Sequence, residues 1–485
     1  MLALSRGSEV PRPASLSVDP PAAGTRIVDG ALAAMRRHRT SWPRDLGCTP
    51  AARSIARLLG RKDPLAAPSL DPVPRFSKPR AFALLFTAIA SVGMGQSMLF
   101  AVLAPLGREV GMSEIQIGAI ISGSSLSFFF FSNIWGRLSD RLGRRRVILI
   151  GLCGYTIGTV GFASSFSAAL AGVLAPTSAF VLLTAVRMVQ SSVMSATPPA
   201  ASAFIADITD VSDRARGMSV IGAAQNVGTI AGPAIGGTLA LISLLTPIWL
   251  GAVLTLVTAV LIYATLSEPP KRVAPRVTGR LRFTDRRVVP FVVVGVSMFV
   301  GFAIVQQTLA FRIQDVLGLS PAETAGVFGI ALMASGAASL LAQVTIVQWL
   351  GVPPMRLLRI ATPILMTAFG VIAFGRDELS LVAGMTTLGS GMGLAVPGFT
   401  AGASLAVGAE DQGAVAGVTS SCPPLGFTIG PLLGSALYGI DAQLPYLTAL
   451  AIYVPLALFV FVFLRPEDPG TPSAPLSGDA SSPIT

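Results

Sequence analysis

The stretch Gly136-Arg-Leu-Ser-Asp140-Arg-Leu-Gly143-Arg144-Arg145-Arg146 separates two long apolar runs, at residues 115–135 and 147–166. Its five arginines and one aspartate cannot lie inside a bilayer, because each charge placed in hydrocarbon costs several kcal/mol. An excess of arginine marks the cytoplasmic side of a membrane protein, and the stretch has two glycines, Gly136 and Gly143, where the backbone is expected to reverse sharply. The stretch therefore predicts a tight turn at a cytoplasmic membrane surface. A simpler interpretation is that it only anchors the topology.

The composition of the whole chain supports a membrane protein. Of 485 residues, 52% are hydrophobic and only 12% are charged, which is not typical of a soluble globular protein. Apolar segments of about 20 residues recur, each long enough to cross a hydrocarbon core of roughly 30 Å. No alternation typical of barrel strands is visible, so the segments predict helices. The net charge of +11 lies mostly in the tail and loops, which argues against nucleic-acid binding.

The apolar segments predict an all-α membrane protein with twelve transmembrane helices in two pseudo-symmetric six-helix bundles. A repeat supports the two bundles, because "GTIAGPAIGGTL" from Gly228 reappears as "FTIGPLLGSAL" from Phe427. The twelve predicted spans are 82–104, 115–135, 147–166, 179–203, 217–240, 247–266, 289–310, 322–344, 357–374, 379–402, 413–437 and 444–464.

These spans predict five parts of the chain. Residues 1–78 are interpreted as a disordered cytoplasmic extension, with a transit peptide or a misassigned start as alternatives. The other parts are a bundle at 79–266, a cytoplasmic linker at 267–288, a bundle at 289–465 and a disordered tail at 466–485. Most Lys and Arg residues fall in the tails, the arginine-rich turn and the linker, which predicts cytoplasmic termini. The opposite loops hold Arg108, Arg312 and Arg376.

The turn, as G-x-L-x-D-R-x-G-R-R-R, resembles the signature loop between the second and third helices of the major facilitator superfamily. The resemblance implies a transporter that works by alternating access, with a small-molecule substrate. We also expect a functional monomer. The resemblance also implies that Asp207 pairs with the turn. We hypothesise that Asp140, Arg144 and Asp207 form a cytoplasmic charge cluster that latches the two halves in the outward-facing state, the alternative being plain surface ion pairs. The residues assigned to this conformational switch are Gly136, Asp140, Arg141, Gly143, Arg144, Arg145 and Asp207.

Glycines in the fifth span recur at every fourth position, so they share one helix face and predict close approach of a neighbouring helix. Pro233 removes a backbone hydrogen bond and predicts a bend. A packing seam with no further role is an alternative. The string G-x-x-x-G-P-x-x-G-G resembles the fifth-helix signature of drug:proton antiporters, which implies export. The motif residues are Gly228, Gly232, Pro233, Gly236 and Gly237.

Arg187 is the one charge deep inside a predicted span, and it should face the bundle interior or a wet cavity. Gln190 follows it at helical spacing on much the same face. "RMVQS" from Arg187 resembles the fourth-helix motif R-x-x-Q-G, which implies a link to proton transfer, with Ser191 in place of glycine. Bidentate binding of an anionic substrate and a structural role bonded to backbone carbonyls are the alternatives.

Polar side chains within several spans are candidates for a substrate cavity. Buried amides in lipid-embedded helices mark either interhelical bonds or a wet pathway. No span contains a carboxylate at mid-membrane depth, so proton coupling through Asp140 or Asp207, through the charge of the substrate, or no coupling at all are open alternatives. The candidates are Gln96, Gln225, Asn226, Gln306 and Gln307, with Phe128 and Phe311 as apolar candidates.

The sequence thus predicts proton-coupled efflux of a small organic compound, drug-like or anionic, from a bacterial inner membrane. Import of an organic acid by proton symport is one alternative, and a receptor or scaffold without flux is another. The three cysteines and the single His38 lie apart, and the chain has no G-x-x-x-x-G-K-[ST] loop. We therefore expect no metal, no cofactor and no enzymatic activity.

Overall fold

A computed structural model describes residues 78–210, 213–269 and 283–462, and every regular element within these ranges is helical. The predicted N-terminal extension and C-terminal tail, and most of the linker, lie outside the described residues. The helices are α3 (Lys78–Glu109), α4 (Glu114–Leu142), α5 (Arg144–Leu170), α6 (Pro176–Met194), α7 (Thr197–Ile208), α8 (Arg214–Ala240), α9 (Thr246–Thr265), α10 (Val289–Leu317), α11 (Pro321–Ala342), the π-helical η2 (Gln343–Trp349), α12 (Pro354–Phe374), α13 (Glu378–Leu405), the 3₁₀ turn η3 (Ala409–Asp411), α14 (Gln412–Tyr438) and α15 (Leu444–Val462).

The predicted helical segments are all present, with local differences. The fourth span is broken into α6 and α7, because the chain leaves the helix at Ser195 and Ala196, just before Pro198 and Pro199. The eighth span continues into η2. The seventh extends past its predicted end to Leu317, beyond the apolar run. The helices at the seventh and eighth spans are therefore longer than the apolar runs from which they were predicted.

Ten segments of the described chain are long and apolar enough to cross a membrane. The two long helices outside this set are α8 and α14, which carry the repeated glycine motif. α8 packs against α3 and α11, and α14 packs against α10 and α4. Protein therefore covers much of both helices, so they need fewer large apolar side chains than a helix that faces lipid.

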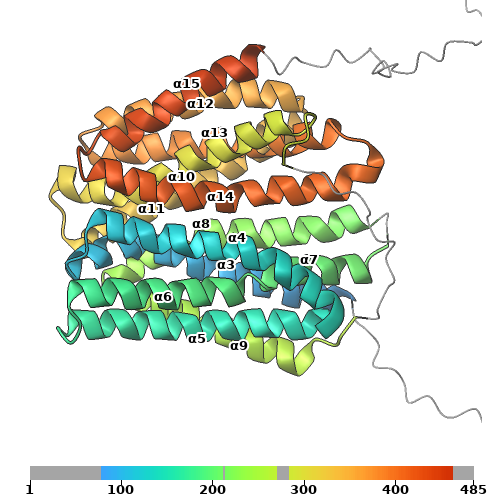
Figure 1. The fold of residues 1–485 in the computed structure, drawn as a ribbon, viewed down its shortest axis with the longest axis horizontal. Helices are drawn as coiled ribbons and strands as arrows, with labels where there is room; N and C mark the ends of the chain where they lie inside the picture. Colours follow the sequence, from blue (N-terminus) through green and yellow to red (C-terminus); the bar gives the residue numbers. More distant parts are fainter. Residues whose placement is uncertain (1–77, 211–212, 270–282, 463–485) are drawn as a thin grey trace, which may run out of the picture. The chain divides into compact units, whose positions relative to one another are not determined.

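The contacts repeat between the two halves, as the sequence repeat predicts. α3 packs on α8 and α9, just as α10 packs on α14 and α15, and α5 packs on α6 and α9 as α12 packs on α13 and α15. We call α3–α9 the first bundle and α10–α15 the second bundle. Between them α4 lies along α14 and α8 lies along α11, and Figure 1 shows α4 and α14 running side by side.

The two ends of the bundles differ in how their cores are joined. We call the end where α4 meets α5 the turn end, and the end where α3 meets α4 the far end. Toward the far end, buried residues of both bundles, such as Leu103 and Leu309, belong to one continuous apolar core. At the turn end the first bundle has a separate core around Leu85, Leu152 and Phe204. The bundles are therefore closed against each other toward the far end.

Candidate functional site

The arginine-rich turn is tighter than the sequence predicts. α4 continues to Leu142 and α5 begins at Arg144, so Gly143 is the single residue between them. Its φ of 100° suits glycine, and an added Cβ would lie 2.8 Å from the Glu268 carboxylate. Gly136 lies within α4 and does not help to reverse the chain, which corrects the prediction of two glycines at the reversal.

The turn brings together the three charged residues of the hypothesised cluster. Arg144 contacts Asp140 at 2.6 Å and Asp207, near the end of α7, at 3.0 Å. The Asp207 side chain is 14% exposed and the Asp140 side chain is 63% exposed, so the pair with Asp207 is the better shielded from solvent. Arg141 is exposed. The cluster thus fastens α5 to both α4 and α7.

Glu268, just after α9, completes the cluster and was not identified from the sequence. Its carboxylate accepts hydrogen bonds from the backbone N–H groups of Arg144 and Arg145, the first two residues of α5. A carboxylate at a helix N-terminus satisfies free N–H groups and the positive end of the dipole. The Arg145 guanidinium donates to the Tyr263 carbonyl on α9. These partners lie on helices of the first bundle or, for Glu268, directly after α9. The contacts therefore do not join the two bundles in this conformation.

The glycine face of α8 makes the close helix contact that its spacing predicts. A Cβ at Gly228 would lie 2.9 Å from the Ala90 carbonyl oxygen, and one at Gly232 would lie 2.7 Å from the Met94 carbonyl oxygen, both on α3. Gly236 faces α3 as well, at Met98. The Ser97 hydroxyl donates to the Gly228 carbonyl at 2.8 Å. Here the two backbones lie in close contact, with the small Ser97 side chain bridging them.

Two further glycines bring the bundles together. A Cβ at Gly329 of α11 would lie 2.5 Å from the Pro233 carbonyl oxygen, and one at Gly118 of α4 would lie 2.5 Å from the Pro431 carbonyl oxygen. Pro233 and Pro431 occupy matching positions of the sequence repeat. Each bundle therefore presents a proline carbonyl to a glycine of the other, and Gly237 also faces α11.

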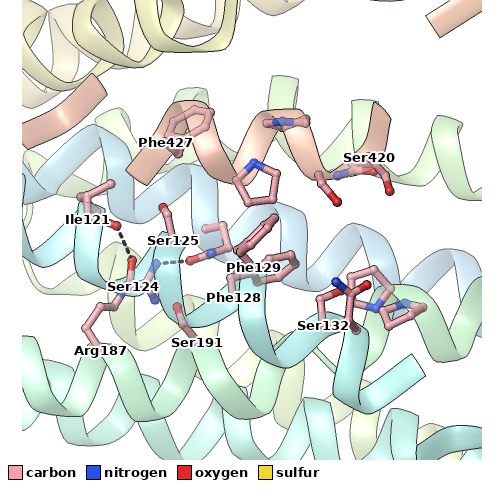
Figure 2. Close-up of a pocket in the computed structure, with 18 of the residues that line it drawn as sticks. Ile121, Ser124, Ser125, Phe128, Phe129, Ser132, Arg187, Ser191, Ser420 and Phe427 are labelled. Atoms are coloured by element: carbon pink, nitrogen blue, oxygen red, sulfur yellow. Dashed lines mark hydrogen bonds between the residues drawn. The ribbon is translucent and has the colours of Figure 1, made fainter. Parts of the chain in front are cut away.

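A cavity of about 570 Å³ lies between the bundles, within the size range of small-molecule sites. The first bundle supplies most of its wall, and the second supplies α14; Figure 2 shows Ser420 and Phe427 of α14 across from Phe128 and Ser132 of α4. The lining residues are Gln96, Phe100, Ile121, Ser124, Ser125, Phe128, Phe129, Ser132, Asn133, Arg187, Ser191, Pro198, Pro199, Ser202, Gln225, Ser420, Ser421, Pro423, Pro424 and Phe427.

The cavity is bounded by aromatic rings toward the far end. Phe427 lies 6.0 Å from Phe100 of α3 and 6.2 Å from Phe302 of α10, measured between ring centroids. In the other direction the lining continues through Ser132 and Ser202, which lie nearer the turn end than Arg187. The cavity therefore extends from mid-depth toward the turn end.

Arg187 lies in the cavity wall and is only 2% exposed. Its guanidinium donates to the side-chain carbonyl oxygens of Gln190, at 2.6 Å, and of Gln96 on α3. Gln190 in turn donates to the Thr159 hydroxyl and the Tyr155 carbonyl of α5. The Arg187 Nε has no hydrogen-bond partner. In Figure 2 the side chain extends from α6 toward the cavity.

The structure separates the remaining cavity candidates. Gln96 and Gln225 line the cavity, as does Phe128, whereas Asn226 and the α10 residues do not. Gln307 is buried, and the side-chain carbonyl oxygen of Gln306 is buried without a partner. The candidates that lie elsewhere are Asn226, Gln306, Gln307 and Phe311. The second bundle's described share of the wall comes from α14, so these α10 residues do not reach the cavity.

A polar cluster joins the bundles at the far end, and the sequence did not reveal it. Arg108 at the end of α3 contacts Asp315 of α10 at 2.6 Å and Glu114 of α4 at 2.7 Å. Tyr438 of α14 donates to the Asp315 carboxylate at 2.6 Å, and the Arg108 guanidinium lies 4.8 Å from the Phe311 ring centroid. Asp315 lies beyond the apolar run that marked the seventh span, so no local pattern linked it to Arg108.

Arg312 is a second buried arginine, which corrects its expected place in a loop. It is 3% exposed on α10 and donates to the backbone carbonyls of Ala373, Gly375 and Ala442. Two of these carbonyls lie at the C-terminal end of α12, where carbonyl groups lack helical partners. Its role is structural, because it joins the end of α12 to the start of the α15 region.

Comparison with known proteins fits this architecture. The sequence profile described as "Major Facilitator Superfamily" matches residues 85–423. The chain belongs to the major facilitator superfamily. It is therefore an integral, multi-pass membrane protein of a transporter family and not an enzyme.

Curated members of the superfamily match at low identity. "Multidrug resistance protein 1" of Bacillus subtilis (strain 168) is 25% identical over 78% of this chain and 95% of its own length. "Tetracycline resistance protein, class C" of Escherichia coli is 28% identical over 77% and 94%, respectively. A bacterial homologue of the human lysosomal transporter Spinster, solved in an inward-facing and unoccupied conformation, has a TM-score of 0.62 at 14% identity, covering 79% of this chain and 97% of that one. That structural likeness shows the fold alone.

Proposed function

We propose that this major facilitator protein exports a small organic compound by alternating access, driven by proton entry. The observation that carries the proposal is the cavity between the bundles, bounded toward the far end and extending toward the turn end. Rocking of two bundles about such a cavity exposes it to one side at a time. The names of the resistance proteins among its relatives favour export over import, and so does the glycine–proline motif of α8.

We assign the turn end to the cytoplasm of a bacterial inner membrane, with both termini there. The support is the concentration of arginine in the turn and tails. In this orientation the described conformation faces inward. We also infer that a single chain is the working unit, because both bundles and the cavity come from one chain.

The turn cluster then acts when the cavity closes toward the cytoplasm. In the inward-facing conformation Arg144 is held by Asp140 and Asp207, and Asp140 stays largely exposed. When the turn ends of the bundles approach each other, the exposed Asp140 and Arg141 become available to the second bundle. The cluster keeps α4, α5 and α7 rigid, and its outer charges latch the outward-facing state.

Proton coupling requires a group that gains and loses a proton during the transport cycle. Within the described residues that line the cavity there is no acidic side chain. The coupling groups are therefore carboxylates near the helix ends, such as Asp140, Asp207 or Asp315, or the substrate itself carries the charge that is exchanged.

Proteoliposomes with an internal pH-sensitive dye test the function. Addition of an exported compound should dissipate an imposed pH gradient, and protein-free liposomes should show no such effect. In cells, deletion of the gene should raise intracellular accumulation of the compound. Lower accumulation on deletion would favour a symporter for uptake, and absence of proton or compound movement across several chemical classes would favour a protein without flux.

A further inference from the structure

Two buried arginines of this chain have different hydrogen-bond partners. Arg312 donates to three backbone carbonyls, away from the cavity. Arg187 donates to two neutral amide side chains, and the Nε of each of the two arginines has no partner. A guanidinium has five N–H donors, so several donors of Arg187 are without a protein acceptor. Arg312 joins backbone carbonyls at the ends of other helices, whereas Arg187 lies in the cavity wall, so the structural role of Arg312 does not account for Arg187.

The positive charge of Arg187 also has no counter-charge in the cavity. Among the described residues that line the cavity, Arg187 is the only charged side chain. A buried charge without an opposite partner is costly in a low-dielectric site. The Phe162 ring, whose centroid is 5.9 Å from the guanidinium carbon, offsets that cost only in part. The lining of the cavity therefore carries a positive charge with no negative one, and a bound anion would balance it.

The rest of the wall fits an apolar body attached to that anion. Phe100, Phe128 and Phe427 line the cavity around the level of Arg187, and Pro423 and Pro424 add a flat apolar surface from α14. The Ser125 hydroxyl of α4 supplies a further neutral donor, whereas the Ser124 hydroxyl already donates to the Ile121 carbonyl. Phe427 and Ser125 lie on opposite walls in Figure 2.

We propose that the substrate is an amphipathic organic anion, whose charged group binds the free donors of Arg187 and whose apolar ring system lies against Phe100, Phe128 and Phe427. This assignment rests on the proposed transport function and names its substrate class. Arg187 then acts as the anchor for a carboxylate, sulfonate or similar group, since its planar donors suit bidentate recognition of such oxygens.

Three naphthalene probes of similar size test the charge preference: 2-naphthoate, neutral 2-naphthamide and the cationic (naphthalen-2-yl)methyl-trimethylammonium. Purified protein should bind the anion most tightly. Arg187→Gln should weaken binding of the anion by about tenfold or more, and should change the affinity for the amide little. Arg286→Gln is the matched control, because it removes the same charge from an exposed position outside the cavity.

Several outcomes would overturn the assignment. One is that the wild-type protein binds the cation as tightly as the anion or more tightly. Another is that Arg187→Gln folds and binds 2-naphthoate with unchanged affinity. If Arg187→Gln does not fold, the assignment is tested by the probe preference of the wild type and of Arg187→Lys. The Arg187→Lys variant should still prefer the anion, but should bind it with lower affinity than the wild type. In proteoliposomes, gradient-driven movement of the cation alone would reject the anion assignment and keep the transport function. If no probe is bound and no probe is transported, both the anion assignment and the transport function are rejected.

Discussion

Arg108 of the first bundle and Asp315 of the second lie 2.6 Å apart at the far end, where Tyr438 also binds the Asp315 carboxylate. The pair connects helices that must separate if the cavity is to open in that direction. A charge-assisted hydrogen bond of this kind contributes directly to the closed conformation, and its partners are lost together when the bundles part.

Asp315→Asn should make the far end open more often. Loss of the ion pair removes about 1–2 kcal/mol of closing free energy, so opening should increase roughly 5- to 30-fold. The reporter is a cysteine at Ser435, a buried residue beside Gly118 whose hydroxyl has no partner. Its labelling by a membrane-impermeant maleimide from outside should become faster.

The labelling experiment needs a background in which the native cysteines, Cys48, Cys153 and Cys422, are replaced by serine. Asp441→Asn serves as the control, because it neutralises an exposed acid at the same end. Equal labelling rates for Asp315→Asn and the parent would mean that the pair does not hold the bundles closed.

The two acids that bind Arg144 should not be equivalent. Asp207→Asn removes the shielded partner and should lower the thermal unfolding midpoint, through a loss of about 1–2 kcal/mol. Asp140→Asn removes an exposed partner and should cost less than about 1 kcal/mol. Its larger effect should be on transport, if Asp140 meets the second bundle in the outward-facing state. Wild-type turnover in Asp140→Asn would remove the latch hypothesis.

Gly232→Ala should destabilise the first bundle, because its methyl group would meet the Ser97 hydroxyl and the Met94 carbonyl of α3. Overpacking of this kind typically costs about 1–3 kcal/mol. Gly222→Ala on the same helix is the matched control, since an added Cβ there meets nothing within 4 Å. The two variants should differ in thermal midpoint in detergent. Identical midpoints would show that the α3–α8 contact relaxes easily.

Arg312→Gln should lower the yield of folded protein, because three backbone carbonyls lose a cationic donor and a glutamine has fewer N–H groups to replace it. The expected loss of stability is about 2–4 kcal/mol. Substrate preference of the surviving protein should not change, since Arg312 does not line the cavity. Altered probe selectivity in this variant, with normal stability, would contradict the structural role.

Features encoded by local sequence could be predicted. The helical segments follow from apolar runs, the α3–α8 seam from the spacing of Gly228, Gly232 and Gly236, and the burial of Arg187 from its place within a span. Each of these depends on neighbours in sequence or on the helical repeat. The broken fourth helix was missed, although Pro198 and Pro199 were its local signal.

Features that depend on distant residues could not be predicted. Arg108 and Asp315 are more than two hundred residues apart, and only the packing of α3 on α10 brings them together. Glu268, just after α9, caps the N-terminus of α5, and no local sequence pattern predicts this contact. Arg312 was placed in a loop because the apolar run ends before α10 does.

The modest hydropathy of α8 and α14 has a consequence for how the protein enters the bilayer. Neither helix is apolar enough to be expected to partition well by itself, and each depends on a groove in an earlier helix. Synthesis order meets that need, since α3 emerges before α8 and α10 before α14. We therefore expect each glycine-faced helix to enter the bilayer after its packing partner and to be stabilised there by contact with it.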